Sequence, residues 1–156
     1  MNEQLKFHEI EVEYDLAEFM PNVLADANKL EQVFLNIIAN ARDAMDAREE
    51  RDKEIASGKG PVFSGSQDYK KLLRIRSFAE NGNAVVAISD TGGGISKEAK
   101  EKIFEPFYTT KETGKGTGLG MSISYNIIKD FRGSIRFEVE EDVGTTFWVE
   151  LPIFYG

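Results

Sequence analysis

The sequence contains no cysteine among its 156 residues. That absence excludes disulfides, zinc sites built on thiolates and thiol nucleophiles together. Basic residues are also scarce, because 19 lysines and arginines stand against 27 aspartates and glutamates and leave a formal net charge of −8. A protein that binds nucleic acid along its phosphates needs a basic surface, so we expect no nucleic-acid partner.

Long apolar runs are missing as well. The N-terminal stretch MNEQLKFHEIEVEYD has no apolar signal-peptide core, and nowhere do about 18 apolar residues follow one another. We therefore expect a soluble, cytoplasmic chain without direct membrane contact, which is compatible with a membrane-anchored parent protein. With 41% hydrophobic and 29% charged residues, the composition is that of an ordinary globular domain.

The first half of the chain shows one strand pattern and one helix pattern. Residues His8–Tyr14 alternate between apolar and acidic side chains, which predicts a half-buried strand. A capping box at Asn28 is followed by apolar residues at helical spacing, so we expect a core helix from about Lys29. The sequence turns polar after Arg48, and we interpret about 49–71 as a frayed helix end followed by an exposed insertion.

The second half predicts further strands and a second core helix. Strands are expected over Leu72–Phe78, Ala84–Ser89, 135–139 and 147–151, and the helix over Met121–Phe131. This order favours an α+β fold, a two-layer sandwich with about three helices over a five-stranded mixed sheet. The 156 residues are enough for one domain with a proper core and too few for two, so residues 1–156 are expected to form a single domain.

A glycine-rich stretch between Asp90 and Ile123 does not match the common phosphate loops. The spacing fits neither a P-loop nor a dinucleotide fingerprint. Asp90 instead ends a predicted buried strand, where a carboxylate is costly unless a donor faces it. The glycines at 92–94 clear space beside it, which suits a flat, amine-bearing ligand such as adenine. An aspartate that only caps the turn before a helix at Ser96 is the alternative.

Two asparagines interrupt the apolar run of the first helix. Asn36 and Asn40 lie four residues apart, and Asp43 continues the same stripe. Asparagine is a mediocre helix former, so a pair of them here suggests a function. Amide oxygens facing a hydrated Mg²⁺ that phosphates also hold would be such a function, and solvated helix surface is the alternative.

Five segments then resemble a known family. LEQVFLNIIANARDAMD, DTGGGI, IFEPFYTTK, GTGLGMSI and GTTFWVELP resemble, in this order and spacing, the N, G1, F, G2 and G3 boxes of the histidine-kinase ATP-binding domain. The resemblance covers about Glu11 to Pro152 and is nearest to the nitrogen-regulation type of sensor kinase. It implies the Bergerat fold of the GHKL superfamily, with ATP and Mg²⁺ as cofactors.

The resemblance also implies roles for single residues. Asn40 would be the principal Mg²⁺ ligand with Asn36 assisting, and both would be catalytic together with Lys111. Asp90 would accept the adenine amine, with Thr145 helping through water. Glu105–Lys111 and the following glycines would form a lid over ATP. The nucleotide contacts implied in addition to Asn40, Asp90, Lys111 and Thr145 are Arg42, Asp43, Gly92, Gly94, Ile95, Lys115, Gly116, Thr117, Gly118, Leu119 and Gly120.

Two positions bear on the reaction. The gyrase and MutL branches carry a glutamate four residues before the metal-binding asparagine, where it activates water. Here that position is Asn36, and an amide cannot act as a general base, so we expect a kinase rather than an ATPase. Many family members carry a lysine where Asp43 stands. Either Arg42 or a lid lysine takes its place, or nucleotide binding is weaker.

The phosphoacceptor is expected to lie elsewhere. His8 opens a predicted strand, whereas a phosphoacceptor histidine lies on a long helix, so we interpret His8 as an edge-strand residue. The phosphoacceptor and sensor domains are then absent from this chain. The expected function is the ATP-binding catalytic domain of a sensor histidine kinase. It would phosphorylate a histidine on a separate dimerisation domain, for relay to the aspartate of a response-regulator receiver domain. A regulatory nucleotide-binding module or a serine-directed GHKL kinase acting on a protein partner is the alternative.

Overall fold

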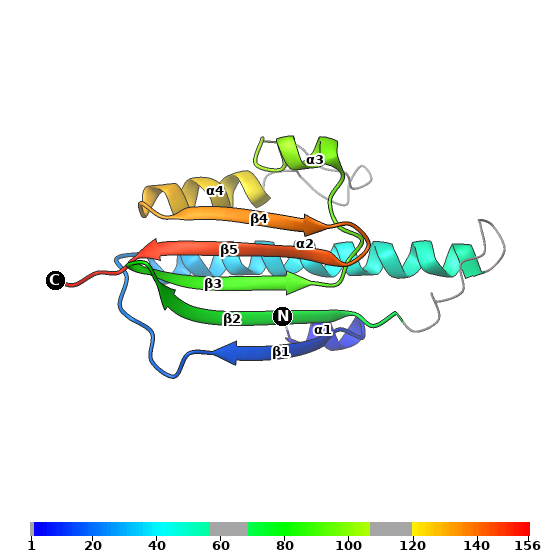
Figure 1. Ribbon diagram of the computed structural model, residues 1–156, viewed down its shortest axis with the longest axis horizontal. Helices are drawn as coiled ribbons and strands as arrows, with labels where there is room; N and C mark the ends of the chain where they lie inside the picture. Colours follow the sequence, from blue (N-terminus) through cyan, green and yellow to red (C-terminus); the bar gives the residue numbers. More distant parts are fainter. Residues whose placement is uncertain (1, 57–68, 107–119) are drawn as a thin grey trace.

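The computed structural model describes residues 2–56, 69–106 and 120–156. One layer is a five-stranded mixed sheet with the strand order β1-β2-β3-β5-β4 (Figure 1). Its strands are β1 Glu11–Leu16, β2 Leu72–Glu80, β3 Asn83–Asp90, β4 Ser134–Glu140 and β5 Gly144–Pro152. Only the β1–β2 pair is parallel. The described helices are α1 Asn2–Phe7, α2 Ala27–Glu54, α3 Lys97–Lys102 and α4 Gly120–Asp130. The expected α+β class is confirmed, with four described helices in place of about three.

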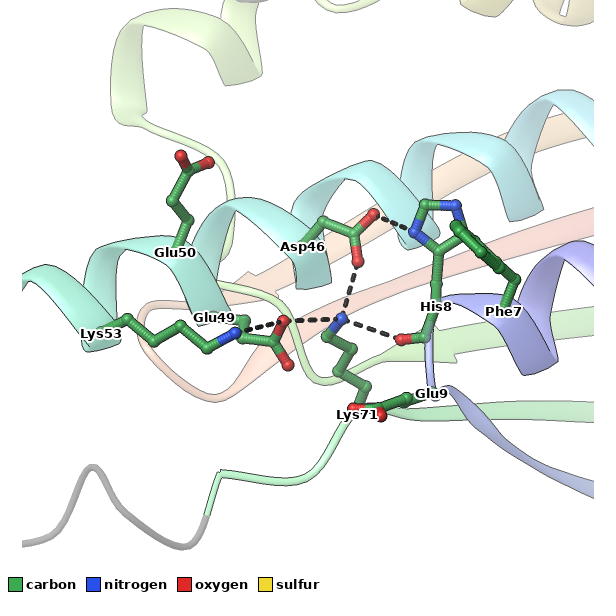
Figure 2. A pocket seen from close by; sticks show the side chains of 8 residues that line it. All are labelled: Phe7, His8, Glu9, Asp46, Glu49, Glu50, Lys53 and Lys71. Carbon is green, nitrogen blue, oxygen red and sulfur yellow. Dashed lines mark hydrogen bonds and ion pairs between the residues drawn. The ribbon is translucent and has the colours of Figure 1, made fainter.

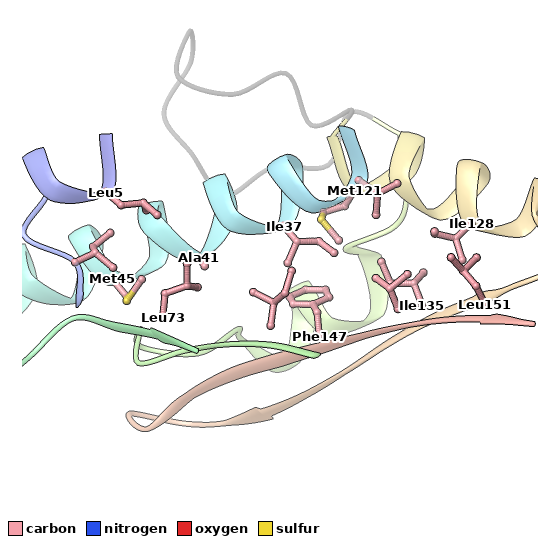
Figure 3. Close-up of a cluster of buried hydrophobic side chains, with 14 residues drawn as sticks. Leu5, Ile37, Ala41, Met45, Leu73, Met121, Ile128, Ile135, Phe147 and Leu151 are labelled. Carbon is pink, nitrogen blue, oxygen red and sulfur yellow. The ribbon is translucent and has the colours of Figure 1, made fainter. Parts of the chain in front are cut away.

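The core lies between the sheet and the helices α2 and α4 (Figure 3). Helix α2 buries one side chain per turn, namely Val33, Ile37, Ala41 and Met45. The sheet contributes Leu73, Ile88, Phe147 and Val149, among others. Met45 has no exposed surface, so its truncation to alanine would cost about 2–5 kcal/mol of stability. This packing fixes the position of α2 against the sheet. It therefore also fixes the positions of the polar side chains of α2.

Helix α2 is longer at both ends than the sequence pattern predicts. Asp26 is the N-cap and accepts a hydrogen bond from the Lys29 amide at 3.1 Å, so the predicted capping box at Asn28 is wrong. At the other end the helix continues to Glu54 rather than fraying after Arg48. Ion pairs one turn apart support this polar half, because Arg48 contacts Asp52 and Lys53 contacts Glu49.

The strand predicted over His8–Tyr14 is wrong in its first residues. Helix α1 ends at Phe7, His8 and Glu9 form the turn that joins α1 to β1, and the strand begins only at Glu11. Glu9 has a φ of 59°, and the amide of Ile10 donates to the carbonyl of Leu5 at 2.9 Å, which closes the helix in a Schellman-type motif. Leu5 is 3% exposed, so burial of this one side chain explains why a short, polar segment forms a helix.

The ends of the predicted exposed insertion are packed. Lys71 is only 7% exposed, and its Nζ lies 2.8 Å from Asp46 Oδ1 and 3.2 Å from Glu49 Oε1 (Figure 2). Asp46 also contacts Nδ1 of His8 at 2.6 Å. Burial lowers the pKa of Lys71, but its hydrogen bonds to the two carboxylates outweigh this and leave the pKa raised. The expectation of exposure is therefore wrong at Lys71, while residues 57–68 lie outside the described part of the chain.

Two hairpins connect antiparallel strands, β2 to β3 and β4 to β5. Asn81 and Gly82 both have positive φ, 53° and 79°, which is the geometry that a two-residue turn between β2 and β3 requires. Strand β5 then pairs with β3 and β4 on its two sides. This topology brings the end of β3 and the start of β5 together at one end of the sheet (Figure 1).

Candidate functional site

Asp90 is a buried carboxylate at the last position of β3. It is 8% exposed, and burial raises the pKa of Asp90 from 3.8 to about 6, although hydrogen bonds from the backbone of Gly92 and Thr145 counteract part of this. The Gly92 amide donates to Asp90 Oδ1 at 2.8 Å. A buried carboxylate needs a hydrogen-bond donor, and the turn after β3 supplies one through the Gly92 amide.

Two of the three glycines after Asp90 occupy positions that exclude a side chain. A Cβ at Gly92 would lie 2.8 Å from Cβ of Ala44 on α2 and 3.0 Å from Asp90 Oδ1. Gly94 has a φ of 88°, and a Cβ there would lie 2.9 Å from Val139 Cγ1. The glycines therefore allow close approach between the turn, helix α2 and strand β4.

The predicted residues around Asp90 are brought together. Thr145 on β5 is directly opposite Asp90 in the β3–β5 register and is 4% exposed. Ile95 is half-buried and packs against the hydrophobic core. Asp90, Gly92, Gly94, Ile95 and Thr145 thus form one cluster at the end of the sheet.

Asn36 faces helix α4. Its Nδ2 donates to the carbonyl of Gly120 at 3.2 Å and to Ser124 Oγ at 3.1 Å, and Ser124 Oγ donates to the same carbonyl at 2.8 Å. The amide nitrogen of Asn36 therefore anchors the first turn of α4, and Oδ1 is the side-chain atom whose lone pairs could bind a metal or its water. Asn40 follows one helical turn later and is also half-buried.

Arg42 and Asp43 contact each other. Arg42 Nε and Nη2 lie 3.3 and 3.2 Å from Asp43 Oδ1, and Arg42 Nη1 lies 2.8 Å from Gln4 Oε1 on α1. To replace the missing lysine at a triphosphate, the Arg42 guanidinium would have to leave these partners. In this conformation the structure does not bring Arg42 to the Asp90 cluster.

The remaining predicted contacts belong to the lid. Gly120 is described and begins α4. The others lie outside the described residues, namely Lys111, Lys115, Gly116, Thr117, Gly118 and Leu119.

Sequence reasoning missed Arg48, Tyr69 and Ser124. Arg48 Nη1 and the Tyr69 hydroxyl both donate to the carbonyl of Thr91, at 3.0 and 2.7 Å. Helical spacing places Arg48 one turn after Ala44, the residue that packs on Gly92, and this was the signal available for Arg48. Ser124, four residues after Gly120, carried a similar signal as a polar residue in an apolar helix. For Tyr69 the only signal in the sequence was an aromatic residue in a polar stretch.

The sequence pattern described as "Histidine kinase-, DNA gyrase B-, and HSP90-like ATPase" matches residues 25–154. The chain belongs to this family. It is 41% identical over 144 residues to the sensor kinase CckA of Brucella abortus (strain 2308), which covers 92% of this chain and 14% of that protein. It is also 31% identical over 153 residues to sporulation kinase E of Bacillus subtilis (strain 168), covering 98% of this chain and 18% of that kinase. The chain thus spans less than a fifth of either relative.

Solved structures of the family share the fold. The nucleotide-free catalytic domain of the histidine kinase ThkA superimposes with a TM-score of 0.71 at 30% identity, covering 97% of this chain and 86% of that one. Full-length ShkA in complex with AMPPNP gives a TM-score of 0.74 over 98% of this chain and 27% of that one, and at 24% identity it supports the fold alone. The ATP-binding sandwich expected from the sequence is confirmed.

The described residues suit an adenine nucleotide better than a free metal ion. Asp90 offers a buried acceptor beside a close-packed glycine turn, whereas the described part of the chain holds no group of three histidine, aspartate or glutamate side chains that would bind a metal on its own. Mg²⁺ would thus need phosphate oxygens as partners. None of the described helices is both long and apolar enough to span a bilayer.

Proposed function

We propose that the chain is the ATP-binding catalytic domain of a sensor histidine kinase and passes the γ-phosphoryl group of ATP to a histidine on a separate helical domain. The observation that carries this proposal is the Asp90 carboxylate, buried at the end of β3 beside glycines that leave no room for side chains. Family membership supports ATP as the nucleotide.

Adenine recognition follows from the charge of Asp90. With a pKa of about 6, the carboxylate is ionised at neutral pH and accepts a hydrogen bond from the exocyclic amine of adenine. Guanine presents a carbonyl at that place, and two acceptors facing each other in a buried site repel. Thr145, opposite Asp90 on β5, supports the same end of the base through water.

The phosphates extend from Asp90 toward α2 and the first turn of α4. Asn40, with Asn36 assisting, would hold Mg²⁺, which neutralises charge on the phosphates when it is bound. Asn36 also fixes Gly120, and the backbone amides that open a helix favour phosphate oxygens. Lys111, Lys115 and the residues 116–119 complete this part of the site in the proposal.

The side chain of Asn36 favours phosphoryl transfer over ATP hydrolysis. It has no basic group, and its amide nitrogen is engaged with α4. The position that activates water in the ATPase branches therefore serves a structural contact. His8 is also unsuited as the acceptor, because it lies in the turn after α1, whereas a phosphoacceptor histidine lies on a long helix.

One observation favours a second candidate function. Arg42 is held by Asp43 and Gln4, so among the described residues it does not take the place of the missing lysine in this conformation. A regulatory module that binds the nucleotide weakly and acts on a partner without transfer would fit that pairing. The helical phosphoacceptor domain and the receiver domain of a response regulator are the partners that the first proposal requires.

Labelled ATP distinguishes the two functions. The chain is incubated with a helical phosphoacceptor domain taken from its parent protein, and acid-labile label on that domain is expected. Asn40→Asp should abolish or severely reduce the label, whereas Asn126→Asp, an exposed asparagine on α4, should not. Nucleotide binding without transfer would establish the regulatory module, and rapid phosphate release by the chain alone would place it among the ATPases.

A further inference from the structure

The carbonyl of Thr91, the residue after Asp90, accepts two side-chain hydrogen bonds. One comes from Tyr69 just before β2, whose hydroxyl donates at 2.7 Å, and the other from Arg48 Nη1 on α2 at 3.0 Å. Arg48 Nη1 also reaches the carbonyl of Gly92 at 3.4 Å. Two elements that are distant in sequence therefore hold the turn beside the candidate adenine site.

Arg48 and Tyr69 form a single partly buried unit. The guanidinium carbon of Arg48 lies 4.3 Å from the centre of the Tyr69 ring, and the Arg48 side chain is 19% exposed. Its Nε is the one buried polar side-chain atom without a hydrogen bond among the described residues, and Asp52 Oδ2 lies 3.8 Å away. An unsatisfied buried donor is costly, so stability alone does not account for an arginine here.

The geometry of one peptide links this unit to Asp90. The carbonyl of Thr91 and the amide of Gly92 belong to the same planar peptide, so fixing the direction of one fixes the other. Arg48 and Tyr69 hold the carbonyl, and the amide on the opposite side donates to Asp90 Oδ1 at 2.8 Å. The orientation of the Asp90 carboxylate therefore depends on the two side chains behind the turn.

The rest of the turn is held from the strand side. Thr91 Oγ1 accepts from the Leu72 amide and donates to the Lys70 carbonyl, both at 3.0 Å. These contacts locate Thr91 through its side-chain oxygen and do not involve the Thr91–Gly92 peptide. Ala44, one helical turn before Arg48, packs where a Cβ at Gly92 would lie, so α2 supports the turn from that side as well.

We propose that Arg48 and Tyr69 are positioning residues that set the plane of the Thr91–Gly92 peptide and thereby direct the Asp90 carboxylate at adenine. The last step of this inference rests on the proposed function. Tyr69→Phe removes one donor to the carbonyl, Arg48→Met removes the other while keeping the aliphatic stem, and Arg48→Lys retains a donor. The matched controls are Tyr155→Phe at an exposed tyrosine and Arg74→Met at an exposed arginine that pairs with Glu13 on β1.

The first arm needs no nucleotide. Amide exchange measured residue by residue should show the Gly92 amide exchanging about 3- to 10-fold faster in Tyr69→Phe and Arg48→Met, the effect of one lost hydrogen bond. Both controls and Arg48→Lys should stay near the wild type. Thermal melts of all variants separate this local change from loss of global stability. Unchanged exchange at Gly92 in both test variants would overturn the inference.

The second arm measures the affinities for ADP and inosine diphosphate, which carries a carbonyl in place of the adenine amine. The ADP preference should fall about 3- to 10-fold in Tyr69→Phe and Arg48→Met and be regained in Arg48→Lys. A purely structural role would weaken both nucleotides equally and overturn the positioning role. If the wild type shows no preference while Gly92 exchange responds as expected, the proposed function fails and the link from the peptide to adenine fails with it.

Discussion

The Gly92 amide nitrogen lies 2.8 Å from Oδ1 of Asp90, so the turn after β3 supplies the hydrogen bond that a carboxylate at the end of a buried strand requires. The bond is not sufficient to cancel the cost of burial, because the pKa of Asp90 remains raised to about 6. The chain thus keeps a charged group where a neutral one would be more stable. A loss of stability of this kind is expected where a residue serves binding.

Replacing Asp90 by asparagine should stabilise the nucleotide-free chain at pH 7.5. A folded-state pKa raised above 3.8 means that the carboxyl contributes its full stability below that value and loses it as the pH rises through about 6. The loss is at most about 3 kcal/mol, since each pKa unit corresponds to about 1.4 kcal/mol. Urea denaturation at pH 7.5 should show Asp90→Asn as the more stable protein, and the difference should shrink at pH 4. A less stable variant at pH 7.5 would contradict the burial cost.

Nucleotide affinity should depend on the ionisation of the same group. Between pH 7.5 and pH 5.5 the ionised fraction of Asp90 falls about fourfold for a pKa of about 6, so ADP affinity should fall by about the same factor. Asp90→Asn cannot titrate and serves as the control for protons taken up by the phosphates. Calorimetric titrations at both pH values give the two ratios. If the ratio of ADP affinities at the two pH values is the same for the wild type and the variant, Asp90 does not contact the nucleotide.

Gly92→Ala should damage both stability and binding. The new Cβ would meet Ala44 on α2 and Asp90 Oδ1, and overpacking of this kind costs about 1–3 kcal/mol. Gly82→Ala is the matched control, because a Cβ there meets nothing within 4 Å although the φ of 79° still strains the residue. The control should lose stability but keep its ADP affinity. ADP affinity unchanged in Gly92→Ala would show that the turn does not border the nucleotide.

Asn36 and Ser124 should act as one unit at the start of α4. Either alanine substitution removes a hydrogen bond at Gly120 and should cost about 0.5–1.5 kcal/mol, and the two losses should not add. Chemical denaturation of the two single variants and the double variant measures the coupling. Strict additivity would mean that the Asn36 amide does not anchor the helix.

Local sequence patterns predicted much of the fold and of the site. The nearly continuous apolar run of β3 and the alternation in β5 depend on neighbours in sequence, and so does the Asp90 turn, whose bond to Gly92 spans two residues. The helix α1 was missed because it depends on Leu5 reaching a core made by the rest of the chain.

The support behind the Asp90 turn could not be predicted from local patterns. Arg48 and Tyr69 lie 43 and 22 residues from Thr91 in the sequence, and only the packing of α2 on the sheet brings them together. The polar character of residues 49–54 also concealed the end of α2, because ion pairs rather than apolar periodicity support that turn. Long-range polar contacts of this kind leave no periodic signal.

The most direct test is whether Asp90 selects adenine. Calorimetric titration of the chain with ATP and GTP in the presence of Mg²⁺ should show a preference for ATP. Asp90→Ala should weaken ATP by about 10- to 150-fold, the effect of losing a charge-assisted hydrogen bond, while GTP, no longer facing a second acceptor, should bind at least as well as to the wild type. Equal affinity of the wild type for ATP and GTP would contradict the assignment of this carboxylate to adenine.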